Sequence, residues 1–515
     1  MTLDAPAPDS VEHWARSRAD AVAVIAADGS LTYGEWDDRA NRVADALHRH
    51  GLVAGDRIGM RFRLGLPWFV LQRALQKLGV TQVAVNWKLT PAEAEYIIRD
   101  SDAKGLACDD VHPEPWTERD LGVLITAGQE PNDGWIRLED LLAEGAPRER
   151  FGAPGSSLIL YTSGTTGRPK GVPPRDRTTH PDPDRLARYM ASVGSVPPYP
   201  PDARVLLTLP VHHGLGPGVV ANTTRVGGTV VSLDPFDAES AARLVHEHRL
   251  ECWYAVPTML LRVKALPDEV LDRYDLSSLT SIGTAGAPVP QSLKEWIIER
   301  IGPDVLWEMY GASEAGMLTY ITPDDHLRKP SSSGRPYEEV EVAIVDDDWN
   351  RLATGDTGEI VVNTPMVLDR YLGREPLGDD TIRDGFYRTG DVGHLDDDGY
   401  LFITDRVKDM IVAGGVNIYP AEIEAAVLDH PGVESVAVIG IPQDDFGEQP
   451  MAFVVPRPGR TLTSDDVAAF LDGRLASFKR PRRIDVVDSL PTSPMGKVLK
   501  TELRKPFWEG RDRNV

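Results

Sequence analysis

A run of small and hydroxyl residues, YTSGTTGRPKG, extends from residue 161 to residue 171. It holds four threonine or serine hydroxyls, three glycines and one lysine, Lys170, and it begins at the end of the apolar run SSLILY, which predicts a buried strand. Glycine lets the backbone turn its N–H groups toward a ligand, and the hydroxyls and the lysine add further donors. It is not a G-x-x-x-x-G-K-[ST] loop, because it lacks Gly-Lys-Ser/Thr. The composition therefore predicts a loop that holds phosphate oxygens, with a flexible surface turn as the alternative.

Four further motifs carry side chains that could do chemistry. MYGASEAG contains Tyr310 and Glu314, and YRTGD ends in Asp391. TDRVKDMIVAGGVNIYPAEIE extends from residue 404 to residue 424, and PTSPMGK ends in Lys497. Taken singly, each has a plainer interpretation: Tyr310 could pack in a core, Asp391 could serve a turn, DRVKD could be a solvated charged turn, and Lys497 could be exposed surface.

Together the five motifs resemble the adenylate-forming superfamily, which contains acyl-CoA ligases, adenylation domains of peptide synthetases, and luciferases. The motifs follow the family's order across most of the chain. The resemblance implies that ATP activates a carboxylic acid to an acyl-adenylate with release of pyrophosphate, and that a thiol then attacks the acyl carbon and releases AMP. It implies ATP, Mg²⁺ and coenzyme A as cofactors. Both steps develop negative charge, so positioned cations and N–H donors should supply most of the rate.

The resemblance also implies roles in the nucleotide site. Tyr310 would stack on adenine, Ser313 would donate to the α-phosphate in place of the family's more frequent threonine, and Asp391 would accept from the ribose hydroxyls. Glu314 would hold Mg²⁺, a cation that prefers carboxylate and phosphate oxygens. The expected nucleotide contacts are Thr162, Ser163, Gly164, Thr165, Thr166, Gly167, Lys170, Gly286, Ala287, Pro288, Tyr310, Gly311, Ser313, Asp391 and Arg406.

Catalysis and CoA binding are implied in the same way. Lys497 would enter the active site for adenylation and leave when the small domain rotates, and with Glu314 it belongs to the expected catalytic residues. Lys408 would be the hinge residue. Gly414 and Gly415 would line the passage for the pantetheine arm, where only glycine leaves room. A turn or helix-capping role is the plainer alternative for these glycines.

The acyl site is expected around a pair of histidines. His213 would line or gate the acyl pocket and would complete the expected catalytic set. Either His212 or His213 could instead be a buried histidine whose hydrogen bonds are satisfied. The expected acyl pocket comprises His213, Gly214, Tyr254, Val256, Pro257 and Gly283.

Alternating helical and strand patterns must position these motifs. Thr32 and Glu35 have capping-box spacing, which predicts a helix with Gly51 as its C-terminal cap. Short apolar runs then alternate with helical segments, which predicts parallel sheets covered by helices, with ligands at the carboxyl ends of the strands. The stretch 173–201 is rich in proline and charge. It predicts a loop or partly mobile insertion where the family commonly continues into a helix near a Ser/Thr-His pair.

The pattern changes in the last third of the chain. After about residue 335, shorter strands separated by Gly and Asp turns predict a small antiparallel barrel. We therefore expect an α/β fold in which residues 1–404 form a large N-terminal domain of βα-layered sheets plus this barrel, binding the acyl group and ATP. Residues 405–515 are expected to form a small, mobile α+β C-terminal domain with two helices and three or four strands.

Composition excludes several classes of protein. The chain has 515 residues and a net charge of −24, which argues against a nucleic-acid surface and against docking on anionic lipid. Its two cysteines are far apart, so neither a disulfide framework nor a zinc site is expected. The N-terminus does not have the pattern of a signal peptide, and no apolar stretch is long enough to span a membrane. We expect a soluble, cytoplasmic protein.

Three functions remain open from the sequence. The favoured one is a stand-alone acyl-CoA ligase for a carboxylic acid other than an amino acid, because no aspartate stands out as a partner for a substrate ammonium. The second is an adenylation enzyme that loads a carrier-protein thiol. The third is a family member that has lost adenylation and performs only thioesterification, since the segment after Gly171, Ser313 and PTSPM depart from the family pattern near the ATP phosphates.

Overall fold

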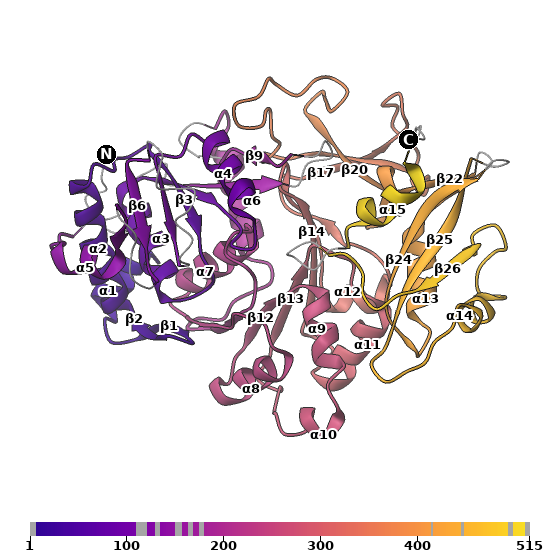
Figure 1. Cartoon of the computed structure of the whole chain (residues 1–515), viewed down its shortest axis with the longest axis horizontal. Coiled ribbons are helices and arrows are strands. Elements are labelled where there is room, and N and C mark those ends of the chain that lie inside the picture. The colour runs from indigo at the N-terminus through magenta and orange to yellow at the C-terminus, as the bar shows by residue number, and fades with distance from the viewer. Residues whose placement is uncertain are drawn as a thin grey trace.

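The computed structural model places the chain in four sheets, counted over the described residues (Figure 1). The N-terminal half lies at the left of Figure 1 and the C-terminal unit, in yellow, at the right. The described residues are 7–109, 121–128, 134–149, 157–162, 168–174, 180–413, 416–443, 447–492 and 498–509.

A seven-stranded sheet near the N-terminus has the order β7-β6-β5-β3-β4-β8-β9. Its neighbouring strands are parallel except for β8 and β9, which form an antiparallel pair. This confirms the predicted parallel rhythm. The strands are β3 (Arg57–Arg61), β4 (Thr81–Ala84), β5 (Gly105–Cys108), β6 (Val123–Thr126), β7 (Ile136–Arg137), β8 (Leu158–Thr162) and β9 (Lys170–Val172), and the nearby helices are α1 (Val11–Ser17), α2 (Tyr33–Arg49), α3 (Leu66–Leu78), α4 (Pro91–Asp100) and α5 (Leu138–Glu144).

A nine-stranded sheet follows, with the order β16-β15-β14-β13-β12-β10-β11-β1-β2. Its centre is parallel and both ends are antiparallel. The strands are β1 (Val22–Ala26), β2 (Gly29–Thr32), β10 (Arg204–Leu207), β11 (Thr229–Ser232), β12 (Cys252–Ala255), β13 (Ser281–Ala285), β14 (Leu306–Ala312), β15 (Gly316–Ile321) and β16 (Arg335–Pro336), and the helices are α6 (Pro183–Gly194), α7 (Leu215–Arg225), α8 (Ala238–His248), α9 (Pro257–Lys264), α10 (Asp268–Leu271), α11 (Gln291–Arg300) and α12 (Pro323–Arg328).

The antiparallel part expected after residue 335 is a five-stranded sheet of order β17-β18-β20-β19, with β21 paired to β20. A second five-stranded sheet, β23-β22-β25-β24 with β26 on β25, belongs to the C-terminal unit. The elements are β17 (Glu341–Val345), β18 (Gly358–Asn363), β19 (Ile382–Arg383), β20 (Phe386–Leu395), β21 (Leu401–Arg406), the 3₁₀ turn η2 (Val407–Asp409), β22 (Ile411–Ala413), β23 (Val416–Ile418), α13 (Pro420–Leu428), β24 (Val433–Gln443), β25 (Gly447–Pro456), α14 (Ser464–Leu471), β26 (Arg483–Val486) and α15 (Lys500–Trp508).

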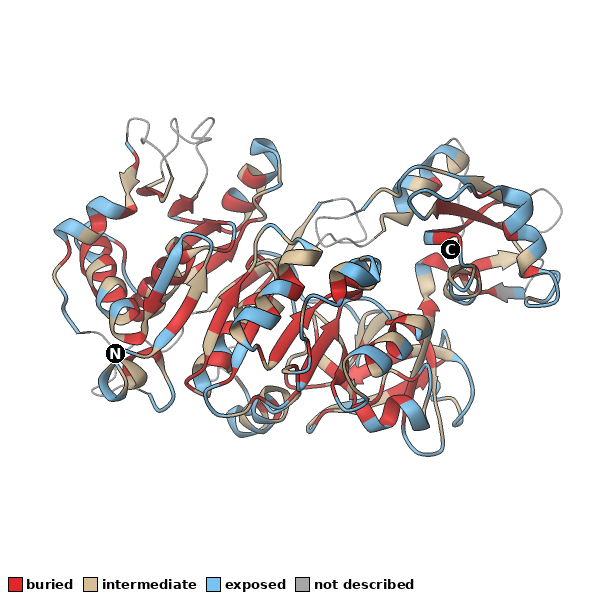
Figure 2. Ribbon diagram, turned by 90° about the horizontal axis from the view of Figure 1, so that it is seen from below, coloured by how far each residue is buried: buried red, intermediate tan, exposed pale blue. Residues whose placement is uncertain are grey.

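Buried side chains follow the sheets, as the red ribbons of Figure 2 show. One large apolar cluster joins α2 and α3 to strands of both N-terminal sheets, so these sheets share a core. The C-terminal unit has its own cluster, formed by β22, β24 and β25 with α13 and α14. The capping box of Thr32 and Glu35 is present at the start of α2, as predicted.

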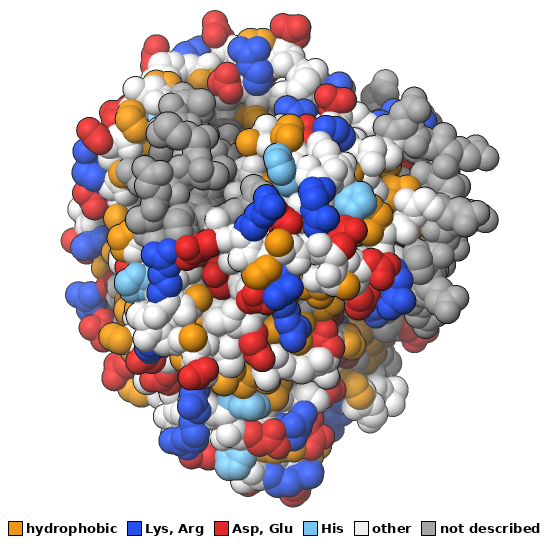
Figure 3. All heavy atoms as spheres, turned by 90° about the vertical axis from the view of Figure 1, so that its left-hand side faces the viewer, with side chains coloured by type: hydrophobic (Ala, Val, Ile, Leu, Met, Phe, Trp, Pro, Cys, Tyr) orange, Lys and Arg blue, Asp and Glu red, His pale blue; other side chains and the backbone are white. Residues whose placement is uncertain are grey.

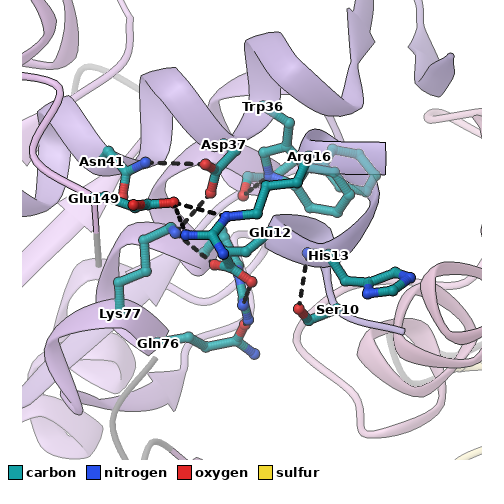
Figure 4. A network of polar contacts seen from close by, with 12 residues as sticks. Ser10, Glu12, His13, Arg16, Trp36, Asp37, Asn41, Gln76, Lys77 and Glu149 are labelled. Carbon is teal, nitrogen blue, oxygen red and sulfur yellow. Dashed lines mark hydrogen bonds and ion pairs between the residues drawn. The ribbon is translucent and has the colours of Figure 1, made fainter. Parts of the chain in front are cut away.

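An ion network fastens the first three helices to one another (Figure 4). The Nζ of Lys77, on α3, lies 2.5 Å from Glu12 Oε1 on α1 and 2.7 Å from Asp37 Oδ1 on α2. Arg73 Nε also donates to Glu12, at 2.9 Å. Burial alone would raise the pKa of Glu12, but Arg73 and Lys77 lower it to about 2, so the carboxylate is ionised at neutral pH.

The prediction of a loop over residues 173–201 is wrong for α6, a helix of 12 residues within it. Asp182 caps the helix by accepting from the Arg185 N–H at 2.9 Å, and proline at the first position suits a helix start. Tyr189 is buried and exchanges two hydrogen bonds with the Met317 backbone. This packing outweighs the proline-rich composition. His180 ends a Thr-His pair just before the cap, so the helix expected from the family is retained.

The C-terminal helix α15 was not expected from the sequence. Leu503 and Phe507 on this helix pack against an apolar cluster of β24 and β25, and the Trp508 Nε1–H donates to the Gly440 carbonyl at 3.0 Å. Pro506 lies inside the helix, and because proline usually interrupts helices the sequence pattern does not predict one here.

Basic and acidic side chains are interspersed over the face of the molecule at the left of Figure 1 (Figure 3). Within the part of the chain that the structure describes, no helix combines the length and the apolar character needed to cross a membrane.

Candidate functional site

Four neighbouring parallel strands of the nine-stranded sheet gather many of the expected residues. β10, β12, β13 and β14 lie side by side, so their carboxyl ends share one edge, where ligands bind in folds of this kind. His212, His213 and Gly214 follow β10, Val256 and Pro257 follow β12, Gly286, Ala287 and Pro288 follow β13, Tyr310 and Gly311 lie near the end of β14, and Ser313 and Glu314 lie in the turn after it.

Lys170 and Glu314 approach the same aromatic side chain from different sheets. Lys170 begins β9, opposite Thr162 on β8, and its Nζ lies 5.1 Å from the ring centre of Tyr371. The Tyr371 hydroxyl donates to Glu314 Oε1 at 3.1 Å. Burial, together with the Glu314 charge, raises the pKa of Tyr371 above its usual range, so the hydroxyl keeps its proton. Tyr371 was missed by sequence reasoning, because nothing in its local pattern links it to a residue 57 positions earlier.

Asp391 stands at the centre of a second polar group. Its Oδ2 accepts from the Tyr310 hydroxyl at 2.6 Å, and its Oδ1 lies 3.0 Å from Arg406 Nε. Asp391 and Arg406 face each other across β20 and β21, and Asp391 is 5% exposed. A carboxylate has about four lone-pair sites, so these contacts leave acceptor capacity for further hydroxyls. Three of the expected nucleotide residues therefore meet.

His212 is buried and His213 is half-buried, and both are neutral. Burial lowers the pKa of His212 to about 3 and that of His213 to about 4. Their ring centres are 4.5 Å apart. Three of their ring nitrogens have no hydrogen-bond partner among the described residues: both nitrogens of His212 and Nε2 of His213. The alternative of histidines whose hydrogen bonds are satisfied is therefore not supported by the described part of the chain, and buried unpaired nitrogens are suited to a ligand.

The expected acyl-pocket residues are tightly packed. A Cβ placed on Gly283 would lie 2.8 Å from the ring of Tyr254, its partner across β12 and β13, so a side chain at position 283 would displace that ring. The Tyr254 hydroxyl donates to the Val196 carbonyl at 3.3 Å, and its ring stacks on Tyr199. Gly214 is exposed, with Leu160 nearby. Val196 and Tyr199 thus fix the Tyr254 ring, and the absence of a side chain at Gly283 leaves the space that this ring occupies.

The segment DRVKD forms the end of β21 and the turn η2, and its aspartates are buried. Asp405 accepts from the Ala421 N–H at 2.8 Å, and Asp409 accepts from Arg504 of α15 at 2.8 Å. Both aspartates are 8% exposed, so the alternative of a solvated charged turn is wrong. Lys408 of the same turn is exposed, and partial desolvation together with Arg406 lowers its pKa.

Some expected residues lie outside the described parts of the chain. These are five residues of the phosphate loop, the two glycines expected at the thiol passage and the lysine near the C-terminus: Ser163, Gly164, Thr165, Thr166, Gly167, Gly414, Gly415 and Lys497.

Two family models match the chain in consecutive segments. Residues 11–372 match the AMP-binding enzyme model, and residues 422–497 match the AMP-binding enzyme C-terminal domain. The first match contains Lys170, Tyr310, Glu314 and Tyr371, and the second ends at Lys497.

Named relatives extend over nearly the whole chain. A feruloyl-CoA synthase of Amycolatopsis sp. is 33% identical, over 96% of this chain and 97% of its own length. A fatty acid–[acyl-carrier-protein] ligase of Streptomyces coeruleorubidus is 32% identical, over 96% of this chain and 95% of its own length. The solved structure of O-succinylbenzoate coenzyme A synthetase from Bacillus subtilis, in complex with ATP and a magnesium ion, has a TM-score of 0.80 at 27% identity and covers 96% of this chain and 99% of that one.

Proposed function

The chain belongs to the family of AMP-binding enzymes, a family of AMP-forming acid–thiol ligases, and on that premise we propose that it is an acyl-CoA ligase. It activates a carboxylic acid other than an amino acid with ATP, giving an acyl-adenylate and pyrophosphate. It then transfers the acyl group to the thiol of coenzyme A and releases AMP. The observation that carries the proposal is the meeting of Lys170, Glu314, Tyr310, Asp391 and Arg406 in two polar groups next to the carboxyl ends of the sheet strands.

The described residues fit ATP and Mg²⁺. Lys170 would meet phosphate oxygens, and Asp391 would accept from the ribose hydroxyls while Tyr310 lies against the base. Among the described residues no group of three or more His, Cys, Asp or Glu side chains could hold a metal ion. Glu314 would therefore bind Mg²⁺ together with phosphate and water oxygens, which is how this small cation usually binds at nucleotide sites. When bound there, the ion would supply positive charge that neutralises the phosphates.

The remaining nucleotide contacts extend this site. We assign Thr162 and the loop residues Ser163, Gly164, Thr165, Thr166 and Gly167 to the phosphates, as their donors predict. Ser313 would donate to the α-phosphate, and Gly286, Ala287, Pro288 and Gly311 would line the base.

The acyl group would lie beside the histidine pair. His213 is half-buried and neutral, and its Nε2 is buried without a partner among the described residues, so it can form a hydrogen bond with a carboxylate or line the pocket. Tyr254, Val256 and Pro257 would form the wall, with Gly283 leaving room for the Tyr254 ring and Gly214 leaving room for the ligand.

The domain boundary is proposed at residue 405. Residues 1–404 would bind ATP and acid, and residues 405–515 would rotate about Lys408. Lys497 would reach the carboxylate and the α-phosphate for adenylation, and Gly414 and Gly415 would admit the pantetheine arm. The buried contacts of Asp405 with α13 and of Asp409 with α15 support a turn that moves with the C-terminal unit.

The test separates the two half-reactions. Acid-dependent ATP–pyrophosphate exchange is measured over a panel of aliphatic, aromatic and amino acids, and CoA thioester formation is measured from presynthesised acyl-adenylates. The proposal predicts exchange with at least one acid that has no amino group, and thioester formation with its adenylate. Thioester formation without exchange for any acid would indicate instead a member that has lost adenylation.

A carrier-protein thiol is the second candidate acceptor. The relative from Streptomyces coeruleorubidus, named as a fatty acid–[acyl-carrier-protein] ligase, favours it. The same assay with a phosphopantetheinylated carrier protein in place of CoA decides between them. Acyl transfer to the carrier protein but not to CoA would establish this second function.

A further inference from the structure

Residues 364–372, which we call the strap, connect the nine-stranded sheet, whose β14 precedes Glu314, with the seven-stranded sheet, which contains Lys170. The strap leaves the end of β18 and is fixed by hydrogen bonds at three points. Thr364 Oγ1 donates to the Ala315 carbonyl at 2.9 Å, and the Leu368 N–H donates to the Glu314 carbonyl at 2.8 Å. The Leu372 N–H donates to the Gly171 carbonyl at 2.8 Å. The strap thus ties the turn that carries Glu314 to the strand that carries Lys170.

Tyr371 is the residue of the strap that touches both charged side chains. Its ring receives the Lys170 Nζ at 5.1 Å from the ring centre, a distance at which a cation is attracted by the ring electrons. Its hydroxyl donates to Glu314 Oε1 at 3.1 Å. The ring and the hydroxyl therefore serve two different partners.

Lys170 and Glu314 each contact Tyr371 and not a charged side chain, over the described residues. Over the described residues, neither Lys170 nor Glu314 forms an ion pair. A lysine and a glutamate that paired with each other would have to break that contact before they could bind a phosphate and a cation. Each is instead held by an aromatic side chain that bears no charge.

We propose that Tyr371 is a positioning residue of the ATP site, whose ring holds Lys170 for the phosphates and whose hydroxyl orients Glu314 for the cation bound to them. The inference rests on the proposed function, since it takes Lys170 and Glu314 as ATP and Mg²⁺ contacts. It assigns the two halves of one side chain to two separable tasks. Removing the hydroxyl should affect only the cation-dependent part of ATP binding, whereas removing the ring should affect both parts.

The test is ATP binding to the full-length chain, measured by isothermal titration calorimetry without any acid, once with Mg²⁺ and once with EDTA. Hydrogen bonds to charged groups are worth about 1.5–3 kcal/mol, so Tyr371→Phe should weaken binding of ATP with Mg²⁺ by about tenfold or more. It should leave binding in EDTA within about twofold of the unmodified chain, because the phenylalanine ring keeps the cation–π contact with Lys170. Tyr371→Leu should weaken binding under both conditions.

Tyr274→Phe is the matched control. The Tyr274 hydroxyl also donates to a glutamate, Glu239 Oε1 at 2.8 Å, but beside α8 and away from the site. This variant should bind ATP like the unmodified chain under both conditions. In steady-state assays Tyr371→Phe should raise the KM for ATP at low Mg²⁺, should be rescued by high Mg²⁺, and should not change the KM for the acid.

Several outcomes would overturn the inference. Tyr371→Phe could bind ATP with Mg²⁺ as tightly as Tyr274→Phe does, which would show that the hydroxyl orients nothing. An equal loss in Mg²⁺ and in EDTA, accompanied by a lower melting temperature, would show a structural role only. If the unmodified chain bound no ATP with Mg²⁺, the proposed function would fall and this inference with it. Binding by the unmodified chain with no selective loss in Tyr371→Phe would contradict the inference alone.

Discussion

At the scale of single residues, the sequence predicts groups that belong to short motifs and misses groups that act from a distance. Lys170, Glu314 and Asp391 lie in motifs whose composition already indicates phosphate, cation and hydroxyl chemistry, and the structure brings them into two polar groups. Tyr371 contacts Lys170 and Glu314 only because the strap joins two sheets. No local pattern encodes that contact, so only the folded chain reveals it.

His213 gives a pH-dependent prediction at the same scale. Burial holds the pKa of His213 at about 4, well below its ordinary value of 6.5, so the folded chain resists a proton that the unfolded chain accepts. Stability from this group is therefore complete above pH 6.5 and is lost as the pH falls toward 4. Acidification from pH 7 to pH 5 should therefore lower the free energy of unfolding by about 2 kcal/mol through His213.

Urea denaturation at pH 7 and pH 5 measures this cost. His213→Gln should lose about 2 kcal/mol less on acidification than the unmodified chain does. The exposed His48, on α2, provides the control, since His48→Gln should follow the unmodified chain. Equal acid sensitivity in all three proteins would show that His213 is not held neutral.

At the scale of elements, the periodicity of apolar residues predicts those strands and helices whose apolar faces are buried. The alternation of apolar runs and helical segments locates β10 to β14 and α8, because strands buried between helices must be apolar. The stretch 173–201 misleads because composition alone does not register that Leu186 and Tyr189 of α6 are buried. α15 is hidden by Pro506, although its contacts with β24 suffice to hold it.

The ion network of the first three helices gives an element-scale prediction. The Lys77 side chain is fully buried and pairs with Glu12 and Asp37, so Lys77→Ala leaves the buried Glu12 and the half-buried Asp37 short of a cation. Breaking a buried pair in this way costs about 3–5 kcal/mol, which should appear as a lower midpoint in urea denaturation. Lys104→Ala breaks an exposed pair with Asp56 at 3.0 Å and should cost at most about 1 kcal/mol. Similar midpoints for the two variants would contradict a stabilising role for the network.

At the scale of the whole molecule, the sequence predicts the large α/β part and the small C-terminal unit, because their strand lengths and turns differ. It does not predict that two aspartates of the connecting segment are buried, since Asp405 and Asp409 find their partners on α13 and α15 of the C-terminal unit. The C-terminal unit therefore holds the turn on which the proposed rotation depends.

The proposed rotation predicts that Lys497 serves one half-reaction only. Lys497→Ala should lower acid-dependent ATP–pyrophosphate exchange by about 100-fold or more, as loss of a positioned charge at a developing anion does. It should leave CoA thioester formation from a presynthesised acyl-adenylate within about threefold, because the lysine is then outside the site. Lys505→Ala, an exposed lysine on α15, is the control and should change neither rate. An equal loss of both half-reactions in Lys497→Ala would contradict separate roles for the two domain positions.

The most direct test of the account is a balance of products. The unmodified chain is incubated with ATP, Mg²⁺, CoA and each acid of the panel, and AMP, ADP and CoA thioesters are quantified by mass spectrometry. We predict that at least one acid without an amino group gives its CoA thioester together with an equal amount of AMP and no ADP. Formation of neither thioester nor AMP with any acid, or formation of ADP in place of AMP, would contradict the assignment as an acyl-CoA ligase.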